Sequence, residues 1–444
     1  MSLGCPKNLV DSEKLLGLLA EAGCVIGAPL KQADVVLVNT CAFIESAREE
    51  SMQAIREAVR AKKKFRVQRV VVAGCLAQKQ ADELLKAEPG IDAIVGVFDR
   101  DKIVPAVMGK LRSGVTKDHQ GCQDDRGRLR LTPRHMAYLR ISEGCSSGCS
   151  YCTIPSIRGP LRSKPLPDVL EEAKELAADG AIELNLIGQD TSAYGQDLTD
   201  RGTAAPGSEG TNLAVLLRKL NEIESVRWIR VMYANPATMT DEMVAAMSEC
   251  ERVVKYLDIP LQHISDKILT RMNRHYNGQR VVDLLARLRR AMPGIIIRTT
   301  FIAGFPGEAI ADYDQLMEFV KTARFDAVGV FPYSAEPGTP AARLPNQIPI
   351  RISQRRRDKL MREQQKVAFD LNWARMDTEL DVLVESQPDP DQGEGLGTGR
   401  HAGQAPEVDG ICHITEPAEV GTIIRARVVD IRDYDLVVEP VQAE

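Results

Sequence analysis

The sequence predicts an α/β protein in three parts: an N-terminal doubly wound α/β domain, a central partial (β/α) barrel and a small antiparallel β-barrel at the C-terminus. Apolar runs of strand length alternate with amphipathic segments up to residue 115 and again from 133 to about 368, which indicates parallel sheets covered by helices. Short β runs between Gly- and Pro-rich turns follow. We therefore expect domains over 1–115, 133–368 and 369–444, with a polar linker over 116–132.

In the N-terminal domain, the apolar runs 33–39 and 69–73 are predicted to be buried parallel strands. Residues 45–63 have helical spacing, with Glu and Arg four residues apart, and 11–21 form a second helix candidate. Only three residues precede the first Gly-Cys turn. We expect the first strand to be cut short, either because the start codon is misassigned or with a loss of the pairing that steadies Cys5.

The central domain is predicted from six strand candidates with helices between them, such as 168–179 and 279–291. Six β/α units predict a barrel or partial barrel, in which catalytic groups lie at the carboxyl ends of the strands. Residues 200–212 are rich in Gly and polar residues and are expected to form a surface loop. The strand candidates are 137–141, 183–187, 228–233, 256–259, 295–301 and 327–332.

The last part of the chain begins with a charged helix candidate over 351–368. Three short β runs follow, over 379–385, 422–430 and 434–439. Their length and the turns between them predict the small antiparallel barrel.

Composition is ordinary for a globular protein, with 44% hydrophobic and 27% charged residues in a chain of 444. No apolar run is long enough to span a membrane, and the N-terminus lacks the basic start and apolar core of a signal peptide. We therefore expect a cytoplasmic protein without a membrane partner. In that reducing compartment, its ten cysteines are expected to bind metal or to react rather than to form disulfides.

The net charge of −5 is unevenly distributed along the chain. Residues 373–444 hold five basic and sixteen acidic side chains, so this segment carries −11 and the rest of the chain +6. An acidic end on a mildly basic body predicts either a basic partner or a solvated surface that aids solubility.

Cys145, Cys149 and Cys152 form a CxxxCxxC loop directly after a predicted strand. Three thiolates this close in sequence can hold three corners of a [4Fe–4S] cluster and leave the fourth iron open. A structural zinc is the alternative, but zinc usually takes four protein ligands, and only His135 lies near enough to be a candidate for the fourth. The spacing therefore favours an iron–sulfur cluster.

This loop, with an aromatic residue at Tyr151 before the third cysteine, resembles the radical S-adenosylmethionine superfamily. The resemblance implies that the open iron binds the methionine moiety and that one electron cleaves the cofactor to a 5′-deoxyadenosyl radical. It also implies cofactor contacts at Tyr151, at Gln189 after the second strand, at Arg230 on the third strand, and at Gly304 in the segment TFIAGFPGE. Each of these predicted contacts has weak support on its own. Arg230 could be a strand-end surface residue, and Gly304 could simply form a turn.

Cys5, Cys41 and Cys75 each begin a loop after a predicted strand, in SLGCPKN, VNTCAFIE and AGCLAQ. In a doubly wound sheet such loops converge at the carboxyl edge, so the three thiols could meet. They could instead be small buried hydrophobic side chains. Asn39 and Gly74 beside them are turn residues rather than strand-core residues, which favours the site.

The phrases GCPKNLVDSE, NTCAFIESAREES and GCLAQ, followed by the barrel and a TRAM-like C-terminal barrel, resemble the methylthiotransferase family over nearly the whole chain. The resemblance implies a second [4Fe–4S] cluster on Cys5, Cys41 and Cys75, whose open iron holds the sulfur to be transferred. S-adenosylmethionine is then both methyl donor and radical source. Four other cysteines match no motif and are predicted to be structural or incidental: Cys24, Cys122, Cys250 and Cys412.

The Pro-Lys-Asn phrase after Cys5 resembles the ribosomal-protein aspartate (RimO-type) branch, whereas the tRNA branch typically has Gln-Met-Asn there. This implies methylthiolation of an aspartate β-carbon in the twelfth small-subunit ribosomal protein, free or in the ribosome, with an electron donor and a sulfur donor as further partners. The acidic C-terminal segment agrees, since it would repel tRNA and attract a basic protein. Two alternatives remain, a tRNA adenosine methylthiotransferase and a non-catalytic, zinc-bearing, ribosome-associated binding protein.

Overall fold

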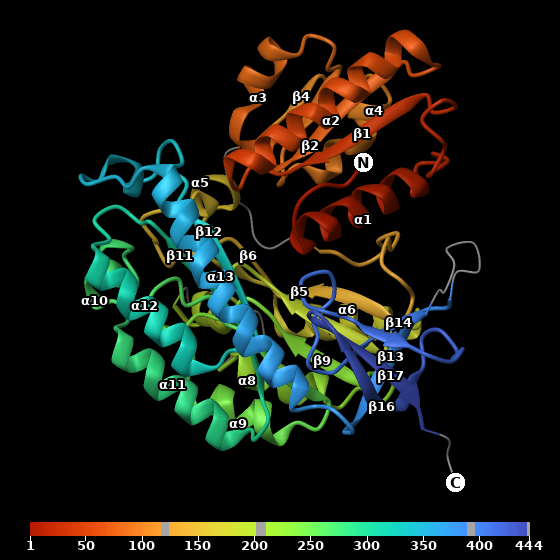
Figure 1. Ribbon diagram of the computed structural model, residues 1–444. Coiled ribbons are helices and arrows are strands. Elements are labelled where there is room, and N and C mark those ends of the chain that lie inside the picture. The colour runs from red at the N-terminus through yellow and green to blue at the C-terminus, as the bar shows by residue number, and fades with distance from the viewer. Residues whose placement is uncertain (117–123, 201–209, 389–395, 442–444) are drawn as a thin grey trace.

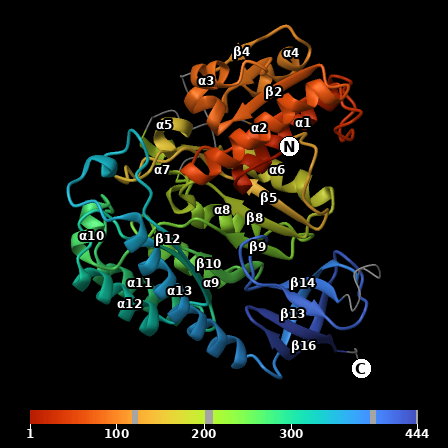
Figure 2. The ribbon, with the colours of Figure 1, turned by 45° about the horizontal axis from the view of Figure 1, so that its top comes forward.

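The computed structural model describes residues 1–116, 124–200, 210–388 and 396–441, and has the three predicted parts (Figure 1). In both views the N-terminal domain lies on top of the central sheet, and the C-terminal barrel lies at one side of its base (Figures 1 and 2). Most of the predicted 200–212 loop and residues 117–123 of the predicted linker lie outside the described residues. Among those that are described, no helix combines the length and apolar character needed to cross a membrane.

The N-terminal domain is a parallel sheet in the order β1-β2-β3-β4, with helices on both faces. Side chains alternate along each strand, so that Val36 and Val70 pack against α2 and α3 while Val71 packs against α1 and α4. This two-sided burial explains why the strands read as continuous apolar runs. The elements are α1 (Pro6–Glu21), β1 (Val35–Thr40), α2 (Glu45–Lys64), β2 (Arg69–Gly74), α3 (Cys75–Ala87), β3 (Ala93–Val95), α4 (Ile103–Val107) and β4 (Ser113–Gly114).

The segment before the first cysteine is short, as expected, but it is paired. Ser2 forms a parallel bridge with Asn39 of β1, and the Leu3 amide donates to the Asn39 carbonyl oxygen at 3.1 Å. Pro6 then begins α1 immediately after Cys5, since proline is well suited to the first position of a helix. Cys5 is therefore held between a bridged residue and a helix start.

The central domain has six parallel strands in the order β5-β8-β9-β10-β11-β12, so each strand lies beside its neighbour in sequence and the predicted partial barrel is confirmed. A short antiparallel pair, β6 and β7, flanks the loop that follows β5. The elements are β5 (Met136–Arg140), β6 (Ser142–Glu143), α5 (Ile154–Arg158), β7 (Arg162–Ser163), α6 (Leu166–Ala178), β8 (Glu183–Ile187), α7 (Gln196–Asp200), α8 (Leu213–Leu220), β9 (Trp228–Val231), α9 (Asp241–Glu249), β10 (Val253–Asp258), α10 (Asp266–Arg271), α11 (Gly278–Ala291), β11 (Ile296–Ala303), α12 (Ile310–Ala323), β12 (Ala327–Pro332) and α13 (Ile350–Trp373).

The C-terminal part is a closed barrel in the order β13-β14-β15-β17-β16. All neighbours are antiparallel except β15 and β17, because five strands in a closed ring cannot alternate in direction throughout. Two of the strands, β14 and β15, were not predicted, since Gly399 and Gly397 weaken the β pattern of one and the other has three residues. The strands are β13 (Glu379–Ser386), β14 (Gly397–His401), β15 (Cys412–Ile414), β16 (Ile423–Arg432) and β17 (Asp435–Pro440).

The C-terminal barrel closes the end of the central sheet where the strands begin. Glu183, the first residue of β8, is fully buried and accepts hydrogen bonds from Arg230 at 3.0 Å and from Arg400 of β14 at 2.6 Å. Burial alone would raise the pKa of Glu183, but the two guanidinium groups outweigh it and hold the pKa below its ordinary value. Glu183 therefore links a strand of the central sheet to the C-terminal barrel through Arg400.

We predict that Glu183→Gln lowers stability by about 3–5 kcal/mol at neutral pH, because it leaves the buried Arg230 without its carboxylate partner and Arg400 with Glu385 alone. The midpoint of urea unfolding measures this. Since the folded pKa of Glu183 is depressed, its contribution is present above the ordinary glutamate pKa of about 4.3 and is lost as pH falls further, so the two proteins converge in acid. Glu379→Gln, at an exposed ion pair, is the control and should change little. An unchanged midpoint in Glu183→Gln would contradict this account.

Candidate active site

The CxxxCxxC loop leaves β6 through Gly144, at the carboxyl end of the first barrel strand. Gly144 has φ of +71°, and a Cβ there would lie 2.1 Å from the Pro160 carbonyl oxygen. Only glycine therefore fits this turn. Backbone amides already point at two of the sulfurs, with Ser147 N 3.5 Å from Cys145 Sγ and Ile154 N 3.4 Å from Cys152 Sγ.

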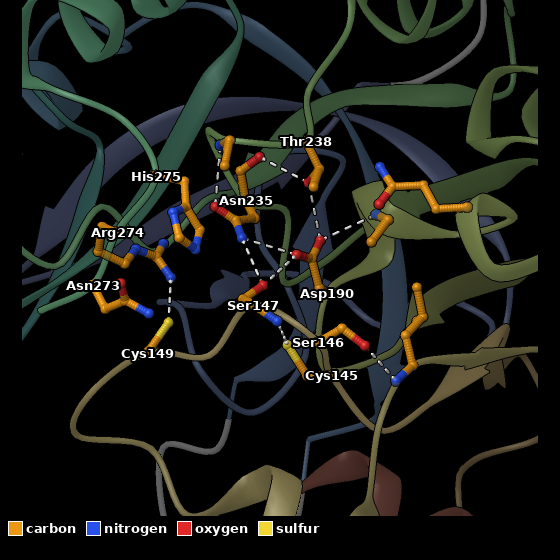
Figure 3. Close-up of a pocket in the computed structure, with 14 residues that line it drawn as sticks. Cys145, Ser146, Ser147, Cys149, Asp190, Asn235, Thr238, Asn273, Arg274 and His275 are labelled. Carbon is orange, nitrogen blue, oxygen red and sulfur yellow. Dashed lines mark hydrogen bonds between the residues drawn. The ribbon is translucent and has the colours of Figure 1, made fainter. Parts of the chain in front are cut away.

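The other side of the loop is held by residues after α10. The amide of Ser150 donates to the Met272 carbonyl oxygen at 2.9 Å, and the Asn273 side chain donates to the Gly148 carbonyl oxygen at 2.8 Å. Arg274 donates to Cys149 Sγ at 3.3 Å, so this sulfur has a half-buried cation beside it (Figure 3). Burial raises the pKa of Cys152 to about 12 and also raises that of Cys145, so the free thiols are neutral until a metal replaces the proton.

A cavity of about 190 Å³ opens beside Cys145 and Cys149, at the carboxyl ends of the strands (Figure 3). Asp190 organises its wall by accepting hydrogen bonds from Asn235 at 2.9 Å and from Thr238 and Ser147 at 3.2 Å. The cavity is therefore polar on one side and bounded by two cysteine sulfurs on the other. Its position matches the barrel end where catalytic groups were expected.

Three of the four predicted cofactor contacts lie around this loop. The ring of Tyr151 packs edge-on against Phe305 at 6.3 Å, which brings the loop against the segment that contains Gly304. Gly304 itself is tightly enclosed, because a Cβ there would lie 1.9 Å from Ser353 Oγ of α13. Gln189 donates to Glu143 at 2.7 Å, while its carbonyl oxygen is buried without a hydrogen-bond partner.

Arg230 lies elsewhere, inside the barrel near the start of the strands. It is fully buried, pairs with Glu183, donates to the Ala402 carbonyl oxygen at 2.8 Å and stacks on Tyr256 at 4.7 Å. It does not line the cavity. It is thus no strand-end surface residue, and these contacts give it a role in joining the C-terminal barrel to the sheet; cofactor binding by Arg230 stays a prediction.

The second cysteine trio gathers at the carboxyl edge of the N-terminal sheet. Cys41 follows β1 directly, Cys75 begins α3 after β2, and Cys5 precedes α1. A Cβ at Gly4 would lie 2.8 Å from the Cβ of Cys41, so the first two loops are in contact. Burial, with Cys5 and Cys41 as nearby titrating groups, raises the pKa of Cys75 to about 12. Cys5 and Cys75 lie at helix N-termini, which favour a thiolate once a metal is bound.

Arg158 joins the two trios. It is the last residue of α5, which begins two residues after Cys152, and it donates to Cys75 Sγ at 3.2 Å. The same guanidinium donates to Asp11 of α1 at 2.8 Å and to Glu143 beside the radical loop at 2.9 Å. The loops also touch directly, since the Thr153 hydroxyl lies 3.5 Å from the carbonyl oxygen of Phe43.

The fit of iron–sulfur clusters to these residues rests on their donor chemistry. All nine cysteines in the described residues are free. In those residues no three or more Cys, His, Asp or Glu side chains are close enough to share a single ion. A cluster binds each cysteine through its own iron, so its ligands stand farther apart than those of one zinc. Each trio has a guanidinium donor to sulfur, Arg274 in one and Arg158 in the other, which suits thiolate ligands.

These features define a radical S-adenosylmethionine enzyme with a second, cysteine-rich domain. The chain matches the family models Uncharacterized protein family UPF0004 over residues 1–96, Radical SAM superfamily over 139–320 and TRAM domain over 378–441. It is 43% identical over 445 residues to "Ribosomal protein uS12 methylthiotransferase RimO" of Citrifermentans bemidjiense, covering 99% of this chain and 97% of the relative. The protein of that name from Anaeromyxobacter sp. is 44% identical, with 98% and 91% covered. The chain belongs to the ribosomal protein uS12 methylthiotransferase RimO family.

Among solved structures, the cobalamin-dependent S-adenosylmethionine radical enzyme OxsB has a similar fold, with a TM-score of 0.52 at 12% identity. The match covers 81% of this chain and 53% of that one. It agrees with an α/β domain joined to a radical S-adenosylmethionine barrel.

Sequence reasoning missed the groups that connect the elements. Arg158 and Asp190 were visible as polar residues beside predicted motifs, but no spacing rule connects residue 158 with Cys75 or 190 with 235. Lys7 was noted only as part of the phrase after Cys5. Cys24, Cys250 and Cys412 lie in apolar surroundings, and Cys122 is outside the described residues.

We predict that Gly144→Ala removes the iron bound by the Cys145 loop and leaves the rest, because a methyl group at position 144 collides with backbone at 2.1 Å. Iron per chain after anaerobic reconstitution should fall by about half. Gly294→Ala is the matched control, since Gly294 has a similar φ of +78° but no neighbour within 4 Å of the added Cβ. Equal iron in the two variants would show that the close contact at Gly144 does not matter.

Proposed function

We propose that this protein methylthiolates the β-carbon of an aspartate in ribosomal protein uS12, using two [4Fe–4S] clusters. The observation that carries the proposal is that the Arg158 guanidinium contacts both Cys75 and Glu143, which lies two residues before Cys145, so that one side chain links the two cysteine-bearing loops. When bound, the clusters and S-adenosylmethionine would supply a 5′-deoxyadenosyl radical at Cys145, Cys149 and Cys152, and methylated sulfur at Cys5, Cys41 and Cys75. The substrate carbon exchanges one hydrogen for one methylthio group.

The chain's own residues hold these two centres facing each other. Arg158 is buried and its contacts with Asp11 and Glu143 fix it from both domains. Asp190 and Asn235 shape the cavity in which the cofactor's methionine end would lie. Gln189 stands next to Asp190 in sequence but does not itself line this cavity.

The surface of the C-terminal barrel supports a protein substrate over tRNA. In its described part only three basic side chains are exposed, Arg425, Arg427 and Arg432, against nine acidic ones. Such a surface attracts a basic protein and repels phosphate. The exposed acidic side chains are Asp377, Glu379, Asp381, Glu407, Glu416, Glu419, Asp430, Asp433 and Glu439.

The reaction requires further partners. An electron donor must reduce the radical cluster, and a sulfur donor must renew the sulfur consumed in each turnover. We place the reaction in the cytoplasm, where free thiols and ribosomal proteins coexist. The domains would be 1–115, 133–368 and 369–444 with a linker over 116–132.

The first test counts iron and sulfide after anaerobic reconstitution. The intact protein should hold about eight irons, and Cys5→Ala and Cys145→Ala should each lose about half, because each removes a ligand of a different cubane. Cys250→Ala, in the core behind the barrel, is the control and should lose none. Bound zinc, or one variant losing all iron, would contradict the two-cluster proposal.

The second test offers uS12 and tRNA separately to the reduced, reconstituted protein. A gain of about 46 Da, one methylthio group in place of hydrogen, is expected on uS12 alone. If the gain appears on tRNA instead, the tRNA adenosine alternative is correct.

A third test addresses the acidic surface. Glu416→Lys with Glu419→Lys should weaken uS12 binding several-fold at low salt and less at high salt, because exposed charges are screened. The control is Asp82→Lys with Glu83→Lys, on α3 at the opposite end of the molecule (Figure 1). It makes the same charge change and should leave uS12 binding unchanged. If both double variants lost the same affinity for uS12, the net charge of the protein rather than this surface would determine binding.

A further inference from the structure

The first turn of α1 carries a buried cation that forms no ion pair with the described residues; the carboxylates of Asp258 and Glu143 act on it only from beyond ion-pair distance. Lys7 is 7% exposed, and its ammonium lies 3.1 Å from the centre of the Tyr233 ring. In the described part of the chain its ammonium has neither a hydrogen bond nor an ion pair. Burying an ammonium ion is unfavourable, and an aromatic face offsets only part of that.

The other cations in this region, Arg158 buried and Arg274 and Arg298 half-buried, have partners. Arg158 pairs with Asp11 and Glu143, and Arg298 pairs with Asp258 at 3.0 Å. Arg274 donates to backbone and to Cys149. Lys7 thus differs from these neighbours, because within the described residues its ammonium contacts only an aromatic ring.

Lys7 lies between the two cysteine trios. It is two residues from Cys5, and its ring partner Tyr233 follows β9 at the carboxyl end of the barrel sheet. The Tyr233 carbonyl oxygen accepts from Thr191, whose neighbour Asp190 lines the cavity beside the radical loop. Tyr233 has φ of +61°, a strained conformation for an aromatic residue, and strain of this kind gathers at functional sites.

We propose that Lys7 is a specificity-determining residue that binds the side-chain carboxylate of the substrate aspartate; this rests on the proposed function. In aspartate the carboxyl carbon is bonded directly to the β-carbon. An ammonium that holds the carboxylate therefore fixes the β-hydrogen between the radical side and the sulfur side. The incoming carboxylate also supplies the counter-charge that Lys7 lacks, and a neutral side chain at the target position would not.

The experiment uses reconstituted full-length protein and two forms of uS12, one natural and one with asparagine in place of the modified aspartate. Affinity is measured with S-adenosylmethionine present and reductant absent, so that no chemistry intervenes. The intact protein should bind the aspartate form about tenfold more tightly or better, as expected for one desolvated charge pair. Lys7→Met should bind both forms equally, and Lys7→Arg should keep the preference. Lys14→Met, on the same helix, is the matched control and should behave as the intact protein.

Two further measurements on Lys7→Met separate other roles. Iron content and S-adenosylmethionine binding should equal those of the intact protein, because the proposal gives Lys7 no part in either. A variant that keeps the preference for aspartate overturns the proposal. So does a variant that loses iron or S-adenosylmethionine, since Lys7 would then serve the cluster or the cofactor's own carboxylate. Failure of the proposed function is distinct, because the intact protein would then methylthiolate neither form of uS12, and both proposals would fall.

Discussion

A buried network of ion pairs fixes the N-terminal domain on the barrel, and the arrangement of the two cysteine trios depends on it. Arg140, at the end of β5, pairs with Asp11 of α1 at 2.7 Å, with Asp125 and with Glu143 at 2.8 Å. Burial alone would raise the pKa of Asp125, but the surrounding cations hold it well below its usual range. Among the described residues the network joins five cationic and five anionic groups: Arg100, Arg128, Arg140, Arg158 and Lys164 with Asp11, Glu13, Asp125, Glu143 and Glu172.

Such a network adds little net stability compared with an apolar interface, since each charge must be desolvated. The network instead fixes the relative position of the two domains. A shift of the domain by a few ångströms would leave several buried charges unpaired, which is far more unfavourable than a shift between apolar faces. Two cysteine loops from independent sheets can therefore keep one relative position, which a shared substrate carbon requires.

The C-terminal barrel acts at the other end of the sheet. A partial barrel leaves interior polar groups such as Arg230 and Tyr256 open to solvent at the base, and Arg400, Ala402 and Asp409 of the small barrel give them partners. One face of this domain therefore completes the central core, while its outer face stays acidic and free. The same small domain closes the core and presents a charged surface.

The fold was predictable because its signals are local. Continuous apolar runs such as 69–73 mark strands buried on both faces, and Gly144 and Pro6 mark a tight turn and a helix start within a few residues of each cysteine. The sequence order of parallel strands then follows from the alternation with helices. Strands β14 and β15 escaped prediction because pairing in the closed barrel, not their own composition, makes them strands.

For the candidate site the sequence indicated the cysteines, whose role as cluster ligands stays a prediction. Their spacing and their place after strands are local facts, whereas the groups that connect them are long-range. Asp125 lies in a stretch that looks like a polar linker, yet it is fully buried among three cations. Arg230 was predicted as a cofactor contact from its place on the third strand, and the sequence did not indicate that its side chain pairs with the glutamate that begins the neighbouring strand. No pattern in the sequence indicates which cationic side chain pairs with which carboxylate.

The balance of charge in the junction also indicates where a substrate can add to it. The network around Arg140 satisfies its own charges, so an anion arriving there would have to displace a buried carboxylate from a guanidinium. An anion arriving beside the Tyr233 ring displaces nothing, because an aromatic face is a weak partner that can keep its contact while the ammonium gains a carboxylate. Among the described residues, the junction thus combines matched ion pairs with a buried cation, Lys7, that has no ion pair. The same feature that fixes the two domains thus directs a negatively charged side chain to the space between the two trios.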